Sequence, residues 1–572
     1  MNNKYRNILL ACMAFAGMSA MAEGENLSKE IVIEKDYVPT EQKAARLNEM
    51  GEVKKVTPEA TKLNFSDWAA PANVNSTFSV LLPYGYNTSA NYSKQRGYFD
   101  FGIGSFFNMV SSAGYKILDT ESNKLNIWFQ HNSTWGGENR LNSEKNVKQK
   151  FLNDILGANF AHRFGENVLS ASGFYRFNRF NFYSDSKDLF QNVNEINLSV
   201  ALARQAHDEF KYNVGLSYNH FANKDNVDNL GPGMKENIFT LTGGASTQSG
   251  EFSRVGIDFK GDYVYYTGIK NNNAEIISII KAAPIENSSS SKNSLSYGVG
   301  HFNPYFDYSN GKTSIRFGAN LDVSFNDGVV LRISPDVKFA YKFIDGIAFY
   351  TDFAGGKYLN TMSKMATINR YFCSDTWLAN SYSPVDAVVG LKFGPFSGFT
   401  AKAWGGYAIV NSQLLPNIMT SVQTTYGAVD MKGWQFGAEL GYRYKEIAEL
   451  KVKGEYSKQE RDKGYVFSQD RPEYVVNVNL GVNPIQKLRI NLDYELRGDR
   501  NAWTMIYTGP LPVLAPTSLG DFSNLSLGAR YEIMPMLSVF AQARNILNKS
   551  WQEWPGYSNQ KFNALAGVAI IF

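Results

Sequence analysis

The sequence is poor in cysteine and proline, nearly neutral, and free of long apolar runs. Two of its 572 residues are cysteine, 18 are proline, and the formal net charge is +4. Cys12 lies in a stretch that we predict below to be a cleaved signal peptide, so Cys373 is the one cysteine of the mature chain. We therefore predict no internal disulfide framework. The small charge gives no reason to expect a nucleic-acid partner. Because no stretch reaches the ~20 apolar residues of a membrane-spanning helix, any membrane segments have to be strands.

Recognisable catalytic and metal-binding motifs are also missing. No histidine has metal-ligand spacing with cysteine or with another histidine. The sequence contains no phosphate loop ending in Lys-Ser/Thr, no His-Glu-x-x-His and no Gly-x-Ser-x-Gly. We therefore predict that the protein is not an enzyme and that it binds no metal or other cofactor.

Aromatic residues and glycine, in contrast, are abundant. Phe, Trp and Tyr make up 14% of the chain, with 33 Tyr, and 48 residues are Gly. The mean hydropathy of −0.30 is that of a soluble protein. A membrane barrel gives the same average, because its interior is polar while its outer face is apolar.

The first 22 residues have the parts of a secretory signal peptide. Lys4 and Arg6 form a positive region, residues 8–17 form a short apolar core, and Ala20-Met21-Ala22 is a small-residue cleavage site. The alternative is a lipoprotein signal cleaved before Cys12, which would leave almost no apolar core. We predict that residues 1–22 are removed on secretion.

Residues 23–74 differ from the residues after them, because they are charged and low in aromatic residues. A segment of this length is too short to have a sizeable core of its own. We predict a periplasmic or plug-like segment here, without the full plug domain of a receptor. The segment either folds back into the lumen of a barrel or extends into the periplasm, and the sequence leaves both alternatives.

From residue 75 onward, apolar and polar residues alternate with a period of two. In residues 434–445, for example, one face carries Trp434, Phe436, Ala438, Leu440, Tyr442 and Tyr444. The strands are about ten residues long, and short turns alternate with long connections, as is typical of outer-membrane barrels. A soluble sandwich or propeller is the alternative, but its strands would be shorter.

The strand count predicts an all-β fold, a transmembrane antiparallel β-barrel of roughly 22 strands over residues 75–572. Such a barrel pairs all of its backbone groups, as lipid requires. Its lumen is wide enough to need a plug. The last strand ends at Phe572 with an apolar face, so we predict that Phe572 closes the barrel against the first strand and serves as an assembly signal.

The end of the chain resembles the C-terminus of TonB-dependent outer-membrane receptors. Residues 544–551 (RNILNKSW), residues 554–557 (WPGY) and the terminal Phe572 carry the resemblance. Gln560-Lys561 stands where that family often has Gly-Arg. The resemblance implies solute uptake or porin-like permeation across a Gram-negative outer membrane, with membrane lipid as a partner. A structural platform of an envelope complex is the alternative.

Segments near the start look like a narrower group, the plugless TonB-receptor-like barrels of Bacteroidota. These segments are residues 36–40 (DYVPT), 96–105 and 126–133. In addition, Glu30, Ile31, Val32 and Ile33 look like the acidic-apolar box through which such receptors contact TonB. The hypothesis is a contact with a periplasmic or TonB-type partner, and an ordinary edge strand is the alternative.

Three groups of side chains have both a functional and a structural interpretation. His131 and Ser133 lie two apart on one face of a strand, like a pair in outer-membrane phospholipase A, but interfacial polar caps explain them better. The mixed charges on the inward faces of the strands fit cross-strand ion pairs better than a substrate track. Cys373 lies beside Tyr371, Phe372 and Trp377, a cluster that could contact a ligand or could be loop packing.

Overall fold

The structure is a computed structural model, and it describes twelve stretches of the chain. They are residues 95–136, 148–182, 189–204, 210–224, 233–268, 294–374, 378–420, 423–461, 471–498, 500–506, 513–554 and 556–572. The predicted signal peptide, the segment 23–74 and Glu30–Ile33 lie outside these stretches. The division of the chain at residues 22 and 74 therefore stays a prediction.

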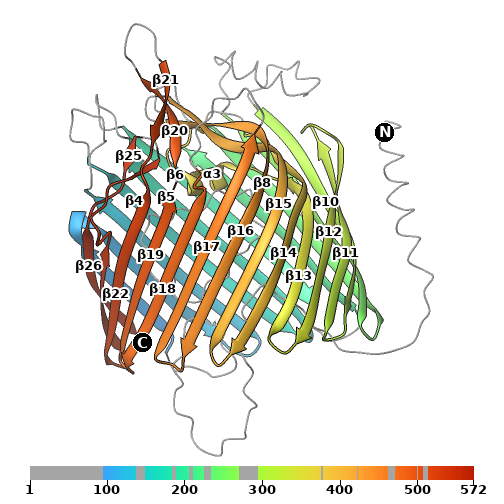
Figure 1. Cartoon of the computed structure of the whole chain (residues 1–572), viewed down its shortest axis with the longest axis horizontal. Coiled ribbons are helices and arrows are strands. Elements are labelled where there is room, and N and C mark those ends of the chain that lie inside the picture. The colour runs from blue at the N-terminus through green and yellow to red at the C-terminus, as the bar shows by residue number, and fades with distance from the viewer. Residues whose placement is uncertain are drawn as a thin grey trace, which may run out of the picture.

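The described part of the chain forms a closed antiparallel β-barrel of 22 strands, as the alternation predicts (Figure 1). Closure comes from β1 (Gly97–Gly104), which pairs on one side with β2 and on the other with the last strand, β26 (Asn563–Ile571). The register of the closing pair runs from Tyr98 opposite Ile571 to Gly104 opposite Leu565. No strand edge of the wall is left open at this seam.

The other wall strands follow in chain order, and each pairs with its predecessor. They are β2 (Met109–Asp119), β3 (Asn123–Trp135), β4 (Lys150–Phe164), β5 (Asn167–Asn181), β6 (Phe190–Arg204), β7 (Phe210–Asn223), β8 (Lys235–Gly250), β9 (Ser253–Thr267), β10 (Ser294–Ser309), β11 (Thr313–Phe325), β12 (Leu331–Ile344), β13 (Ile347–Tyr358), β14 (Ser381–Phe396), β15 (Phe399–Thr420), β16 (Gln423–Tyr444), β17 (Ala448–Arg461), β18 (Tyr474–Ile485), β19 (Leu488–Gly498), β22 (Phe522–Met534) and β23 (Leu537–Arg544).

A few short elements lie outside the wall. The 3₁₀ turn η1 (Ser105–Phe107) joins β1 to β2, and α3 (Met362–Ile368) follows β13. Two small hairpins, β20 (Asn501–Ile506) with β21 (Val513–Ser518) and β24 (Gln552–Trp554) with β25 (Tyr557–Ser558), interrupt the last connections. Among the described residues, no helix is long and apolar enough to span a membrane.

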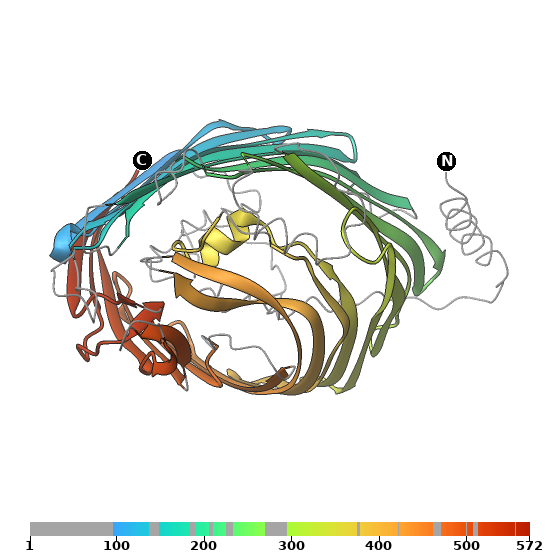
Figure 2. The same cartoon turned by 90° about the horizontal axis from the view of Figure 1, so that it is seen from above.

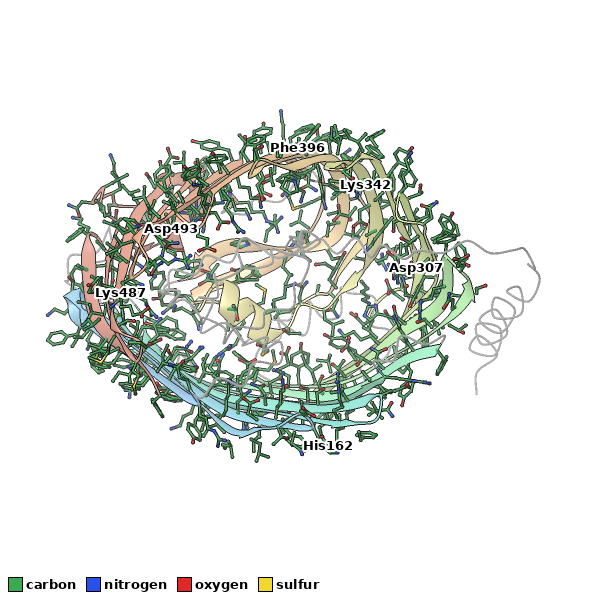
Figure 3. All side chains as sticks on the ribbon, turned by 90° about the horizontal axis from the view of Figure 1, so that it is seen from below. His162, Asp307, Lys342, Phe396, Lys487 and Asp493 are labelled. Atoms are coloured by element: carbon green, nitrogen blue, oxygen red, sulfur yellow. The ribbon has the colours of Figure 1, made fainter. Side chains whose placement is uncertain are left out.

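The two faces of the wall differ in chemistry, because side chains alternate along a strand. Large apolar side chains are exposed on the outer face, among them Leu156, Leu216, Phe317, Ile333, Trp434 and Phe436. Polar and charged groups lie on the inner face; Asp307, for example, belongs to an inward network, whereas His162 lies on the outer side (Figure 3). An apolar outer band around a polar interior is the pattern of a barrel that lies in lipid.

The two ends of the barrel also differ (Figure 1). At the end where the chain terminates, consecutive strands are joined by short turns, such as those after Phe164, Ile344 and Ile485. At the opposite end most connections are longer, the exceptions being η1, the five-residue link between β11 and β12, and the two-residue link between β15 and β16. In outer-membrane barrels the short turns are periplasmic and the long loops extracellular. We use this orientation and call the long-loop end the outer rim.

The hairpin of β15 and β16 leaves the wall at the outer rim. Pairing of β14 with β15 extends to Asn411, and pairing of β16 with β17 begins at Met431. Between these points β15 and β16 pair with each other and with no other strand of the wall, with register shifts after Val410 and Pro416. Such bulges bend a hairpin, and this one turns into the interior of the barrel (Figure 2).

Candidate functional site

The connection between β13 and β14 folds into the lumen rather than projecting from the rim (Figure 2). We call its residues 359–374, which include α3, the internal strap. Thr361 begins the helix, since its side-chain oxygen accepts a hydrogen bond from the Lys364 N–H at 3.1 Å. Met362, Met365 and Ile368 are buried, and their spacing places them on one side of the helix.

A bulge near the end of β13 redirects the chain toward the strap. The register with β14 shifts between Ala354 and Gly356, and Gly356 has φ of 144°. Glycine adopts this conformation readily, whereas other residues do so only with strain. The next backbone N–H, that of Lys357, is bound by the Asp322 carboxylate at 2.8 Å. The departure of the strap from the wall is therefore fixed by backbone conformation as well as by side chains.

The strap covers an apolar patch on the inner face of the barrel, which we call the luminal patch. Its side chains come from β4 to β10 and the residues just beyond their ends: Phe151, Phe180, Phe182, Val193, Phe221, Met234, Ile238, Val264, Tyr266, Tyr297 and Val299. All are buried and form one core with the apolar side of α3. Apolar surface removed from water contributes about 25 cal/mol per Å². Burial of the patch by α3 therefore stabilises the position of the strap inside the lumen.

Carboxylates of the wall bind the start of the helix. Both oxygens of Glu236 lie 3.0 Å from the backbone nitrogen of Met362, and one accepts the Tyr266 hydroxyl at 2.8 Å. On β6, Glu195 accepts the Ser363 hydroxyl at 2.6 Å and pairs with Arg176 at 2.7 Å. A carboxylate stabilises a helix N-terminus, where backbone N–H groups have no partner within the helix.

The far end of the strap contacts the last loop of the chain and the tip of the β15–β16 hairpin as well as the luminal patch. The ring of Tyr371 stacks on Tyr557, with 3.6 Å between centroids, and meets Trp554 edge-on at 5.4 Å. Thr424, at the tip of the β15–β16 hairpin, exchanges backbone hydrogen bonds with Tyr371 and Cys373. Burial raises the pKa of the Tyr371 phenol, so it stays neutral. The strap thus joins the luminal patch to the last loops of the chain and to the β15–β16 hairpin.

A narrow cavity remains between the strap and the wall. Its polar lining comes from Asn178, Gln191 and Asn223 on the wall, Arg370 on the strap and Gln423 on the β15–β16 hairpin. The guanidinium of Arg370 also lies 3.8 Å from the ring centroid of Phe151. The cavity volume is about 10 Å³, enough for about one water molecule, so the strap and the wall are closely packed here.

Elsewhere the inner wall is crossed by ion pairs. Arg316 lies 2.8 Å from Asp336 and 3.5 Å from both Asp307 and Asp258. Other predicted inward charges pair likewise, as in Lys451–Glu439, Lys453–Glu455, Arg497–Glu495 and Arg443–Glu449. Lys451–Glu439 and Arg443–Glu449 join neighbouring strands, as the structural interpretation of the sequence expects, whereas Lys453–Glu455 and Arg497–Glu495 each lie within one strand.

The structure places some of the predicted site residues and leaves others outside its described part. The Phe572 carbonyl accepts hydrogen bonds from the N–H groups of Arg96 at 2.6 Å and Gly97 at 2.7 Å. A role for Phe572 as an assembly signal stays a prediction. Cys373 and its neighbours Tyr371 and Phe372 belong to the strap, whereas Trp377 lies outside the described residues.

The His131–Ser133 pair has a third member that sequence reasoning missed. His131 Nε2 lies 2.9 Å from Ser133 Oγ, and His131 Nδ1 lies 2.6 Å from Asp154 Oδ1. Asp154 lies on the neighbouring strand, directly opposite His131. The only sign of Asp154 in the sequence is that it is a polar residue on an otherwise apolar face of residues 152–160.

No family model matches the chain, and no curated protein matches it either. Solved structures do match, over most of their length. The siderophore receptor PirA of Acinetobacter baumannii superposes with a TM-score of 0.64 at 10% identity, over 85% of this chain and 81% of PirA. The FrpB iron transporter of Neisseria meningitidis gives 0.64 at 12% identity, over 84% and 82%. This barrel has the fold of TonB-dependent receptors.

A third similar structure is the ferric enterobactin receptor PfeA of Pseudomonas aeruginosa, with a TM-score of 0.61 at 11% identity. It is covered over 81% of its length by 84% of this chain. Identities this low establish the fold alone. The internal strap and the luminal patch rest on residues of this chain alone.

Proposed function

We propose that the protein is an outer-membrane barrel that admits or takes up a solute, with the internal strap as its gate. The observation that supports this most is the strap itself. A wide barrel whose lumen is crossed by a docked segment, anchored at both ends by a few specific contacts, is suited to controlled passage. The similar structures carry the names siderophore receptor and iron transporter, which favours uptake over a structural platform.

The finer parts of the proposal come from the sequence. Residues 1–22 are a secretory signal, and residues 23–74 are a short periplasmic segment of a plugless barrel of the Bacteroidota type. Glu30 to Ile33 contact a TonB-type or other periplasmic protein. Passage of a solute makes and breaks no covalent bond, so this function asks for no catalytic residue.

Single-channel conductance in planar bilayers tests the proposal. We would compare the full mature chain with a variant whose residues 361–371 are replaced by a Gly-Ser linker of equal length, a variant lacking residues 23–74, and a combined variant. A chain with the same linker chemistry in the Thr120–Ser122 turn, at the other end of the barrel, is the matched control.

Removal of the strap should raise conductance by several-fold, and the combined variant should conduct most, while the turn control matches the full chain. A combined variant that folds, as judged by heat-modifiable migration on gels, yet stays as closed as the full chain would show that the strap is not the gate. Liposome swelling with sugars of increasing size then measures the opened width.

A further inference from the structure

Three polar side chains form a hydrogen-bonded relay across β3 and β4. Ser133 Oγ lies 2.9 Å from His131 Nε2, and His131 Nδ1 lies 2.6 Å from Asp154 Oδ1. An ionised carboxylate can only accept hydrogen bonds, so Nδ1 carries the proton it donates to Asp154. The Nε2 lone pair is then directed to the Ser133 hydroxyl. Both distances fall in the range of a nucleophile, its base and the group that orients the base.

The relay lies on the outer face of the barrel. His131 and Ser133 lie at odd positions of β3. The other residues on that face of the strand include Ile127, Phe129 and Trp135, which are large, apolar and exposed. On β4 the same face carries Leu156, two residues from Asp154 and also exposed. Directly paired residues point to the same side of a sheet, and His131 is paired with Asp154. The relay therefore faces the medium that surrounds the barrel, which for this fold is lipid.

The height of the relay is that of the outer rim. Ser133 is paired with Met109, the first residue of β2, directly after the η1 turn. Phe107 of that turn and Trp135 are exposed aromatic side chains at the same level. Aromatic belts of this kind mark the interface between hydrocarbon and head groups. The ester bonds of membrane lipids lie at that interface.

A purely structural role explains these residues less well. The cost of an ionisable group on the lipid-facing surface is small near the interface, so the hydrogen-bond partners of the histidines carry the comparison. The described part of the chain holds four histidines, and His162, His220 and His301 each bond an amide or a carboxylate. Within that part, His131 alone joins a carboxylate on one ring nitrogen to a serine hydroxyl on the other.

We propose that Ser133, His131 and Asp154 form a hydrolytic site that cleaves acyl esters of outer-leaflet lipids. Ser133 Oγ attacks the acyl carbonyl carbon as its proton moves to His131 Nε2. The ester C–O bond breaks, and the same proton passes to the leaving alkoxide, which departs as the lysolipid alcohol. Water then attacks the acyl-serine, giving its proton to His131, and the fatty acid leaves as Ser133 recovers that proton. Asp154 is a positioning residue that holds the imidazole and stabilises its charged form.

Access to the hydroxyl requires a local movement. Ser133 is 3% exposed, whereas the side chains of His131 and Asp154 are 20% and 33% exposed. The cross-strand neighbours of Ser133 on this face are Met109 and Leu152. Both are flexible apolar side chains, which an inserted acyl chain can displace. A small organophosphorus probe reaches such a serine more easily than a whole lipid, so both are used in the test.

The test uses the full mature protein, purified in detergent from a host that lacks its own outer-membrane phospholipase. It is incubated with a fluorophosphonate probe, and the adduct is located by mass spectrometry. In parallel, vesicles of glycerophospholipid alone and vesicles containing lipopolysaccharide are assayed for released fatty acid or hydroxy acid, which distinguishes the two ester sources. Ser111, which is paired with His131 on β2, provides the matched control Ser111→Ala.

We expect the wild type and Ser111→Ala to be labelled, with the adduct of the wild type on Ser133, and to release acid at equal rates. Ser133→Ala should lose both signals. Asp154→Asn should lower kcat by roughly 10³- to 10⁴-fold with KM unchanged, because it disturbs the tautomer and not lipid binding. All variants should keep the heat-modifiable migration of a folded barrel.

A folded wild type that is neither labelled nor active would overturn the proposal, as would a Ser133→Ala variant with wild-type acid release. An Asp154→Asn variant with wild-type kcat would remove Asp154 from the relay and leave no oriented base. The inference is independent of the transport proposal, since the relay lies outside the lumen. Its success would replace the prediction that the chain has no catalytic site.

Discussion

Both carboxylate oxygens of Glu236 lie 3.0 Å from the backbone nitrogen of Met362, although 126 residues separate the two in the chain. The contact joins the wall of the barrel to the first residue of the only α-helix in the described stretches. Glu236 is fully buried, and it also accepts the Tyr266 hydroxyl. This carboxylate therefore helps to hold the first residue of α3 against the luminal patch.

We predict that Glu236→Ala loosens the start of the strap. A hydrogen bond to a charged group contributes about 1.5–3 kcal/mol, so amide exchange at Met362 and Ser363 should accelerate by about tenfold to a hundredfold. Hydrogen exchange followed by mass spectrometry measures this in detergent. Glu236→Gln keeps one acceptor oxygen and should fall between. Unchanged exchange in the alanine variant would show that the apolar contacts alone hold the helix.

At the other end of the strap, we predict that Tyr371→Ala exposes the thiol of Cys373. The substitution removes a stacked ring and leaves a cavity, a change that typically costs about 3–5 kcal/mol for an aromatic residue. A water-soluble maleimide should label Cys373 much faster in this variant, in protein lacking residues 1–22. Tyr557→Ala should act similarly, and the double variant should add little. Fully additive rates would contradict the stacked pair as one unit.

A buried ion pair ties β13 to the loop after β11, and we predict that it stabilises the barrel. Lys357 Nζ lies 2.6 Å from Asp327 Oδ2 and donates to Ser324 Oγ at 2.7 Å. Its side chain is 5% exposed, whereas that of Lys338 is 51% exposed. Removing one partner of a buried pair costs about 3–5 kcal/mol, so Lys357→Ala should unfold at lower temperature than Lys338→Ala. Gel-shift melting curves compare them, and equal curves would refute the prediction.

The seam of the barrel offers a fourth prediction, which separates the backbone of Phe572 from its ring. Deleting Phe572 removes the carbonyl that accepts the Arg96 and Gly97 N–H groups, so the fraction of folded barrel should fall. Phe572→Ala keeps that carbonyl and should fold in detergent like the wild type. Heat-modifiable migration after refolding measures both. Defective assembly of Phe572→Ala in cells, with normal refolding, would assign the ring to recognition by the assembly machinery.

The wall of the barrel was readable from the sequence, because alternation follows directly from the geometry of a strand. Trp434 and Phe436 face outward and Glu439 inward, as their positions predict. The luminal patch could not be predicted from this alternation. Phe180, Val193 and Phe221 stand at inward positions that are usually polar, and a single sequence does not tell which apolar residue faces a lumen that is filled. Their burial depends on a strap that arrives from more than a hundred residues away.

One member of the relay on the outer face could not be predicted from the sequence either. The spacing of His131 and Ser133 was visible, because both lie on one strand. Asp154 was not connected to them, since its place opposite His131 depends on the register of β3 with β4. That register is set by how the loop between the strands closes and by all the pairs along them. Neither can be read from one residue, so the third member required the structure.

The internal strap also has a consequence for the order in which the protein is made. Its core joins Phe151 on β4 to Trp554, just before the last strand, so the core cannot be complete until nearly the whole ring has been laid down. Contacts between distant parts of a chain form late, because closing a long loop costs entropy before the contact repays it. The contacts of Tyr371 with Trp554 and Tyr557 need the last loops of the chain, so they form after the contacts of the strap with β4 to β10.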